Sequence, residues 1–280
     1  MNIQNRFKIP VWSAKHEFGA AYGFVERNFR LVRRYIGWEI VFIFYLVVNA
    51  LTIGLIGVGV PGIEANEEVV LFLLAGALLW GFLSAIFSEV AHCISWERWE
   101  GTIEYTFMAP VHRITQLVGS CLFAILYGLI RTVIVFVAAS LFFNVNLLST
   151  NLSGALLVLA AASLSFTGLG LVVAVLPLLS PEKGPQAASI FQAAMLLVSG
   201  VYFEVSALPL GLRYIAMVSP GTYTLRAARA ALLDNAPLTA LVPDIVLLLF
   251  IGVILVPLGY GIFLMGERYA MKTGRLKRSG

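Results

Sequence analysis

The chain has 280 residues, of which 60% are hydrophobic and only 12% are charged, and its mean hydropathy is +0.90. Soluble domains carry roughly 25% charged residues, so this composition excludes a soluble globular protein and indicates an integral membrane protein. The net charge of +4 reads as an orientation signal in such a protein and gives no reason to expect a nucleic-acid partner.

The first 37 residues carry an amphipathic pattern ahead of any long apolar run. Apolar side chains recur at alternating spacings of four and three residues, and arginines fall on the other faces. Such a helix suits the membrane interface, lying in the inner leaflet against lipid. The alternative is a core helix of a small soluble domain, but so short a segment buries little core. The apolar positions are Phe18, Tyr22, Val25, Phe29, Val32 and Ile36, and the arginines are Arg27, Arg30, Arg33 and Arg34.

Six later segments are each long and apolar enough to cross a hydrocarbon core, which needs about 20 helical residues. They predict an all-α integral membrane fold, with a six-helix transmembrane domain between a cytoplasmic segment, residues 1–37, and a basic cytoplasmic tail, residues 267–280. The domain covers residues 38–266, and its predicted spans are 38–60, 69–91, 114–143, 152–179, 186–203 and 241–266.

Cations gather on one side of these spans. Seven lie in residues 1–37 and five in residues 267–280. Loops on that side add Arg98, Arg113 and Lys183, whereas the other side holds Arg213, Arg226 and Arg229. Because positive residues stay in the cytoplasm, we expect both termini to be cytoplasmic in a multi-pass protein of the cell (inner) membrane.

A polar stretch, residues 95–113, separates the second and third predicted spans. On one helix, its apolar side chains would form a stripe with a row of carboxylates beside it. Ser95 is the predicted N-cap, and Pro110 marks the predicted end. An outward row of carboxylates suits a basic protein partner better than anionic lipid headgroups. The stripe comprises Trp96, Trp99, Ile103 and Phe107, and the row comprises Glu97, Glu100 and Glu104.

The segment between the fifth and sixth spans, residues 207–243, is broken by prolines and cannot span as one helix. Two short helices at the outer face, 210–217 and 223–233, fit its pattern, with an ordinary structured loop as the alternative.

Signatures of catalysis and nucleotide binding do not fit this chain. Residues 57–62 match GxGxxG, but they end a predicted membrane helix, with no preceding strand and no helix N-terminus after them to hold a pyrophosphate. The sequence has no GxxxxGK[ST] and no HExxH, and the histidines near the polar stretch lack the spacing for shared metal ligation. We therefore expect no catalytic residue, metal or cofactor in this chain.

Arg131 lies in the middle of a predicted span, where a charge needs a partner. Glu39, Glu89 or Glu204 could supply a carboxylate, as could helix carbonyls. A buried structural pair is the preferred interpretation. The alternative is a charge relay in an ion-coupled secondary transporter that uses Arg131 and a buried carboxylate.

Two motifs resemble the permease subunits of ABC-2 type exporters, which share the ABCG-like (type V) transmembrane fold. Residues 97–111 are similar to the family's E-R-x-x-G-T-x-E-x-L…P-V loop between its second and third membrane helices. Residues 199–223 are similar to its S-G…L-P…N-P-x-T-Y stretch after the fifth. Two departures are Phe203-Glu204-Val205, where many relatives have an apolar residue and a proline, and Gly221, where a larger residue is usual.

The resemblance implies a dimer, with a second permease copy or a paralogue, driven by a separate ATPase subunit that binds ATP and Mg. The loop after the second span would act as the coupling helix that docks on this ATPase, with the N-terminal amphipathic helix touching it too. The coupling residues would be Trp96, Glu97, Arg98, Trp99, Glu100, Gly101, Thr102 and Glu104.

The resemblance also implies a substrate path along the dimer axis, between the second and fifth spans. Bulky aromatic walls with few polar groups favour a drug-like or lipid-like cargo over a lipid-linked glycan, which stays the alternative. Core packing of the same side chains is the other interpretation. The path residues would be Phe72, Trp80, Phe87, Gln192, Met195, Ser199 and Tyr202.

Overall fold

The computed structural model describes residues 14–58, 67–143, 151–180 and 182–273, and every regular element within them is a helix. The all-α prediction is thereby confirmed. The elements are α1 (Ala14–Arg34), α2 (Ile36–Val58), α3 (Glu67–Trp99), α4 (Ile103–Met108), α5 (Arg113–Phe143), α6 (Leu152–Val173), α7 (Val175–Leu179), α8 (Gly184–Val198), the 3-10 turn η3 (Val205–Ala207), α9 (Leu210–Val218), α10 (Pro220–Leu232) and α11 (Leu238–Lys272).

Five helical stretches in the described residues are long and apolar enough to cross a membrane: α2, α3, α5, the α6–α7 pair and α11. They correspond to five of the six predicted spans. The remaining predicted span, residues 186–203, contains α8, an apolar helix of 15 residues that ends in a turn at Ser199. A crossing by α8 therefore stays a prediction.

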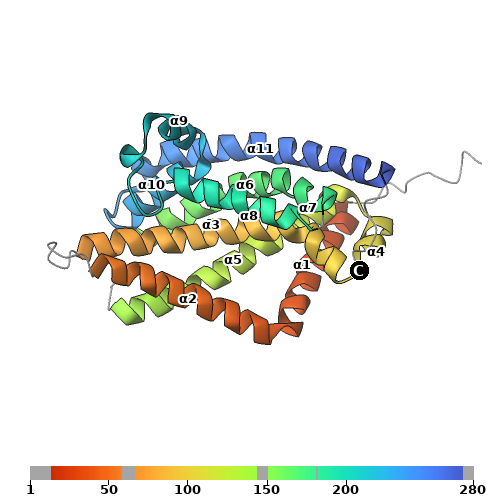
Figure 1. The fold of residues 1–280 in the computed structure, drawn as a ribbon, viewed down its shortest axis with the longest axis horizontal. Helices are drawn as coiled ribbons and strands as arrows, with labels where there is room; N and C mark the ends of the chain where they lie inside the picture. The colour runs from red at the N-terminus through yellow and green to blue at the C-terminus, as the bar shows by residue number, and fades with distance from the viewer. Residues whose placement is uncertain (1–13, 59–66, 144–150, 181, 274–280) are drawn as a thin grey trace, which may run out of the picture.

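The long helices run side by side, and α1 crosses the direction of the bundle instead of following it (Figure 1). One end of the bundle carries α1, α4, α7 and the C-terminal end of α11. The opposite end carries α9 and α10 (Figure 1). The loop between the second and third predicted spans and the segment after the fifth therefore lie at opposite ends of the bundle, as predicted (Figure 1). Which end faces the cytoplasm stays a prediction.

Helix α6 is the most enclosed of the candidate spans, and it packs chiefly against α11. Its buried residues include several alanines, serines and glycines, which allow helix backbones to approach closely in lipid. The Ser165 hydroxyl, for example, donates to the Leu248 carbonyl of α11 at 2.6 Å. These contacts are typical of a helix that packs closely against its neighbours.

The two predicted outer helices correspond to α9 and α10, within three residues at each end. Arg229 of α10 joins the turn after α8 to α3. Its guanidinium donates to the Gly200 carbonyl at 2.9 Å and to the Phe72 carbonyl at 3.3 Å, and it also donates to the Val201 carbonyl. Burial lowers the pKa of Arg229 to about 10, so the group stays charged at neutral pH.

Gly76 of α3 lies under this arginine, and a methyl group there would collide with the Val201 carbonyl and the Arg229 guanidinium. We expect Gly76→Ala to lower the free energy of unfolding by about 1–3 kcal/mol, the usual range for overpacking. Gly81→Ala is the matched control, because a methyl group at this position of α3 meets open space and alanine is the better helix former. Thermal unfolding in detergent measures both, and equal unfolding midpoints would contradict the prediction.

Candidate functional site

The polar stretch after the second span does not form a single helix. Ser95 lies inside α3, which continues without a break to Trp99. The helix ends where Gly101 takes a φ of 70°, a left-handed conformation that glycine adopts at low cost. Helix α4 then begins after Thr102. The predicted N-cap at Ser95 is therefore wrong, because α3 runs through Ser95 without interruption.

The prediction that the carboxylate row faces outward is also wrong for Glu97 and Glu100, whose side chains the structure describes. The Glu97 side chain is 3% exposed, and its Oε1 accepts from Arg27 Nη2 of α1 at 2.8 Å. Glu100 accepts from the Tyr35 hydroxyl at 2.9 Å and lies 3.6 Å from an Arg34 nitrogen. Arginines of α1 cover these carboxylates, and burial requires such pairing. The side chain of Glu104 lies outside the described part of the chain.

The tryptophans at the end of α3 are exposed, whereas the neighbouring Arg98 is buried. Trp96 is 48% exposed and Trp99 is 62% exposed, whereas Ile103 of the same predicted stripe is buried, so the tryptophans of the stripe face outward and Ile103 faces inward. Trp99 instead contacts Tyr35, with the ring centroids 5.4 Å apart. Arg98 is buried and donates to the Leu178 carbonyl of α7 at 2.7 Å. The end of α3 is thus bound to α1 by Glu97 and to α7 by Arg98.

The C-terminal side of the loop is also joined to neighbouring helices, by Arg113 and by Glu17 of α1. Arg113 Nε donates to Glu267 of α11 at 2.9 Å, and its Nη1 donates to the Thr106 carbonyl of α4 at 3.0 Å. Glu17 of α1 accepts from the Thr115 hydroxyl and lies 2.8 Å from His112 Nδ1. The hydrogen bond from Thr115 has the larger effect in lowering the pKa of Glu17, and the contact with His112 lowers it further. Sequence reasoning missed Glu17 and Glu267, because the partners are 95 or more residues apart.

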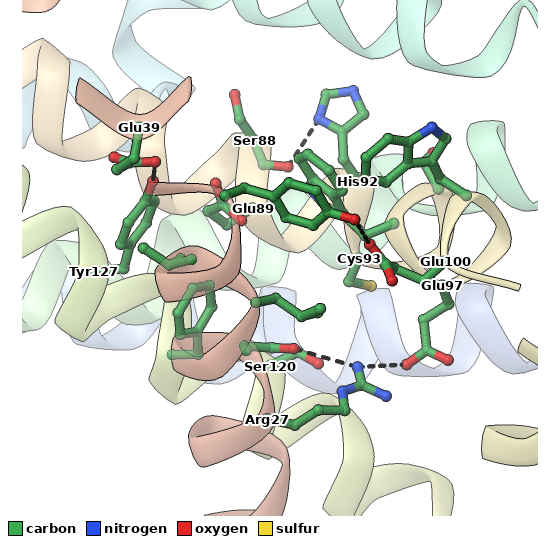
Figure 2. A pocket seen from close by; sticks show the side chains of 18 of the residues that line it. Arg27, Glu39, Ser88, Glu89, His92, Cys93, Glu97, Glu100, Ser120 and Tyr127 are labelled. Carbon is green, nitrogen blue, oxygen red and sulfur yellow. Dashed lines mark hydrogen bonds and ion pairs between the residues drawn. The ribbon is translucent and has the colours of Figure 1, made fainter. Parts of the chain in front are cut away.

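A cavity of about 640 Å³ lies beside this loop, enclosed by α1, α2, α3 and α5 (Figure 2). Sequence reasoning did not find it, because four separate segments form its walls. Its charged side chains are Arg27, Glu39, Glu89, Glu97, Glu100 and Arg131.

Arg131 pairs with Glu39, one of its three predicted partners. Its Nε lies 2.9 Å from Glu39 Oε1, and the Tyr127 hydroxyl donates to Glu39 Oε2 at 2.5 Å. The Arg131 guanidinium also lies over the Tyr127 ring, 4.4 Å from its centroid. Glu204 instead accepts from Ser206. The buried pair within the bundle is therefore confirmed with Glu39 as the partner.

The predicted path residues gather where α3 meets α8, and none of them lines the cavity. Phe87 stacks on Phe191 with a centroid distance of 5.7 Å, and Gln192 accepts from the Ser88 hydroxyl at 2.9 Å. Trp80, Phe87 and Ser199 are buried within the single chain, whereas Phe72, Gln192, Met195 and Tyr202 are half-buried. Their role as a path stays a prediction.

Among the described residues, no group of three or more His, Cys, Asp or Glu side chains is placed to hold a metal ion. The loop and the end of α3 are joined to α1, α7 and α11 beside this cavity. The chemistry of this junction consists of ion pairs and packing between helices.

Comparison with known families gives one match, to the ABC-2 type transporter model over residues 24–233. No curated protein matches the chain. The matched region runs from α1 to the residue after α10 and includes the junction around Glu97, the cavity and the α3–α8 contact. Because this region is three quarters of the 280 residues, the chain belongs to the ABC-2 type transporter family as a membrane permease.

Proposed function

We propose that the chain is the permease subunit of an ATP-driven exporter of hydrophobic, drug-like or lipid-like molecules. It would take its cargo from the cytoplasm or the inner leaflet. A separate ATPase subunit would bind ATP and Mg and supply the energy, and two permease copies or paralogues would form the membrane gate. Family membership supports the transport role, and the junction around Glu97 supports the coupling role.

The observation that carries the coupling role is the attachment of the loop to three helices at once. Glu97 joins the loop to α1, Arg98 joins it to α7, and Arg113 joins it to α11. A displacement of α4 would therefore move several helices together. Tyr105 and Met108 of α4 expose large apolar side chains, which suits a docking surface for a protein partner.

The hydrophobic cargo is supported by the α3–α8 region and by the outer face of α8. Apolar walls with few polar groups suit an amphipathic molecule better than a lipid-linked glycan. Ile190 and Leu197 on α8 are exposed in the single chain, and a second permease copy packed there would place Gln192 and Tyr202 near the dimer axis.

An experiment on vesicles separates this proposal from an ion-coupled secondary transporter. The permease is co-expressed with a candidate P-loop ATPase from the same genome, and uptake of a lipophilic dye into inside-out vesicles is measured. We expect uptake that requires ATP hydrolysis and persists after a protonophore collapses the proton gradient. Uptake that follows the gradient without ATP would overturn the proposal.

The cargo path gives a prediction on ATP hydrolysis by the reconstituted complex. Gln192→Leu and Tyr202→Ala should each reduce substrate-stimulated hydrolysis by about tenfold, equivalent to losing one good contact with the cargo. Ser153→Ala is the control, because Ser153 is exposed on α6 and is not a path residue. Wild-type stimulation by several hydrophobic compounds in both variants would assign these residues to packing and reject the path.

The orientation gives a prediction on accessibility in intact cells. In a background without Cys93 and Cys121, Val218→Cys on α9 should react with a membrane-impermeant maleimide, whereas Met108→Cys on α4 should react only after lysis. Both side chains are more than 70% exposed, so burial does not decide the outcome. Labelling at position 108 but not at position 218 would invert the topology.

A further inference from the structure

We propose that the cavity enclosed by α1, α2, α3 and α5 is a binding site for an amphipathic organic cation, a positive group carried on an apolar body. This site is separate from the predicted path, which lies between α3 and α8. Each permease copy would contain one such site. The inference does not depend on the exporter assignment, because binding can be measured on the permease alone.

The size and walls of the cavity suit a ligand of this kind. Its volume of about 640 Å³ lies within the range of small-molecule sites, about 300–1,000 Å³. Its walls are largely apolar, with aromatic side chains from α2, α3 and α5, including Phe42, Phe123 and Tyr127, and Tyr35 from the turn between α1 and α2. Such walls exclude water and contribute contact area.

The charge on the walls favours a cation. Four carboxylates face the cavity. Three of them pair with arginines, Glu97 with Arg27, Glu39 with Arg131 and Glu100 with Arg34, and among the described residues Glu89 is left without an ion pair. An anionic ligand would have to displace one of these pairs, whereas a cation can meet the charge of Glu89 without breaking any of them.

Two carboxylates of α3, Glu89 and Glu97, are available to a positive group in the cavity. Among the described residues, Glu89 forms no hydrogen bond or ion pair, and Figure 2 shows it between Glu39 and the Glu97 side of the cavity. Independently, Glu97 Oε2 is buried and accepts no hydrogen bond. A buried acceptor without a donor is costly, and a bound ammonium or similar group would lower that cost.

The mouth of the cavity is aromatic and exposed. Trp38 of α2 and the Trp96 and Trp99 side chains of α3 line the cavity and present large exposed surfaces. Tryptophan favours the membrane interface, and its ring attracts cations at its face. A cation that partitions into the lipid interface would therefore meet these rings before it reaches Glu89.

Tetraphenylphosphonium and tetraphenylborate test the proposal, because the two ions have nearly the same shape and opposite charge. Binding of each ion to the purified full chain is measured by equilibrium dialysis in a nonionic maltoside detergent, with empty micelles subtracted. We expect saturable binding of about one tetraphenylphosphonium per chain and no saturable binding of tetraphenylborate. Equal binding of both ions, or preference for tetraphenylborate, would overturn the proposal.

Variants locate the binding. Glu89→Gln should weaken tetraphenylphosphonium binding at least about tenfold, as expected for losing one charged contact, and Trp38→Leu at the exposed mouth should weaken it too. Glu204→Gln, the same change at an exposed carboxylate outside the cavity, should leave binding unchanged. Because Trp38→Leu alters an exposed side chain, it keeps the test decisive if Glu89→Gln unfolds. Wild-type affinity in the folded cavity variants would reject the site.

A competition arm distinguishes two sources of the cation. Lysophosphatidylethanolamine, which carries an ammonium group, is added beside lysophosphatidylglycerol, which does not. Competition by the ethanolamine lipid alone assigns the site to a lipid headgroup, whereas competition by neither lipid assigns it to a free lipophilic cation. Both results support the site. Competition by the glycerol lipid alone would contradict the required positive charge.

Discussion

Glu97→Lys should abolish coupling between ATP hydrolysis and transport and lower the free energy of unfolding by at least about 1–3 kcal/mol, because it also places a second cation beside Arg27. The lost interaction is a charged hydrogen bond of 2.8 Å to Arg27, and bonds of this kind contribute about 1.5–3 kcal/mol. Arg27 is 33% exposed, so water offsets part of the loss. Thermal unfolding and substrate-stimulated ATP hydrolysis in the reconstituted complex measure the two effects.

A second charge reversal on α1 provides the control. Glu26 pairs with Arg30 at 2.6 Å, but both side chains are exposed, and exposed pairs contribute about 0–1 kcal/mol. We expect Glu26→Lys to leave both unfolding and coupling nearly unchanged. If Glu97→Lys behaved like Glu26→Lys, the pair between α1 and α3 would have no role in coupling.

The double variant Arg27→Glu with Glu97→Lys, which exchanges the two charges, separates two explanations for a loss of coupling. If the junction works by holding α3 to α1, the exchange should restore most of the stability and a measurable part of the coupling. Restored stability without restored coupling would mean that Glu97 itself is recognised by the ATPase. Because the Glu97 carboxylate is buried, we expect its reversal to cost stability as well as coupling.

Local sequence signals predicted the elements of this fold well. Long apolar runs located the five long helices, the amphipathic pattern before residue 37 located α1, and prolines divided the outer segment into α9 and α10. Each of these signals depends on residues close together in sequence. The extent of α8 was less predictable, because an apolar pattern does not show where a helix stops and a turn begins.

The junction was less predictable because its partners are distant in sequence. Arg27 and Glu97 are 70 residues apart, and Arg113 and Glu267 are 154 residues apart. Helical periodicity correctly separated tryptophans from glutamates, but it does not show which face a neighbouring helix covers. In a soluble protein the tryptophans would face inward. Here the arginines of α1 bury Glu97, and the tryptophans remain at the surface.

The Arg131–Glu39 pair should show the largest effect on stability. The two side chains are 17% and 12% exposed and lie within membrane-spanning helices. Removing one partner of a buried pair costs about 3–5 kcal/mol, because the other charge is left unpaired. We therefore expect Glu39→Leu and Arg131→Leu each to destabilise the protein by about this amount. Tyr127→Phe, which removes only a hydroxyl that donates to Glu39, should cost about 1–2 kcal/mol.

Replacing both partners should cost much less than either single change. A buried ion pair exchanged for apolar residues of similar volume is often neutral or stabilising, so Glu39→Leu with Arg131→Leu should unfold close to the wild type. Unfolding in maltoside detergent with increasing dodecyl sulfate provides the measurement for this double-mutant cycle. Glu204→Leu, at an exposed carboxylate, controls for loss of charge alone. Additive losses in the double variant would show that the two residues are not energetically coupled.

The same double variant separates a structural pair from a charge relay. A structural pair has no role once both charges are gone, so a stable double variant should retain ATP-driven uptake near the wild-type rate. A relay needs the titratable carboxylate itself, so uptake would be lost while stability was kept. Loss of uptake in a fully stable double variant would therefore reject the structural role and favour the ion-coupled mechanism.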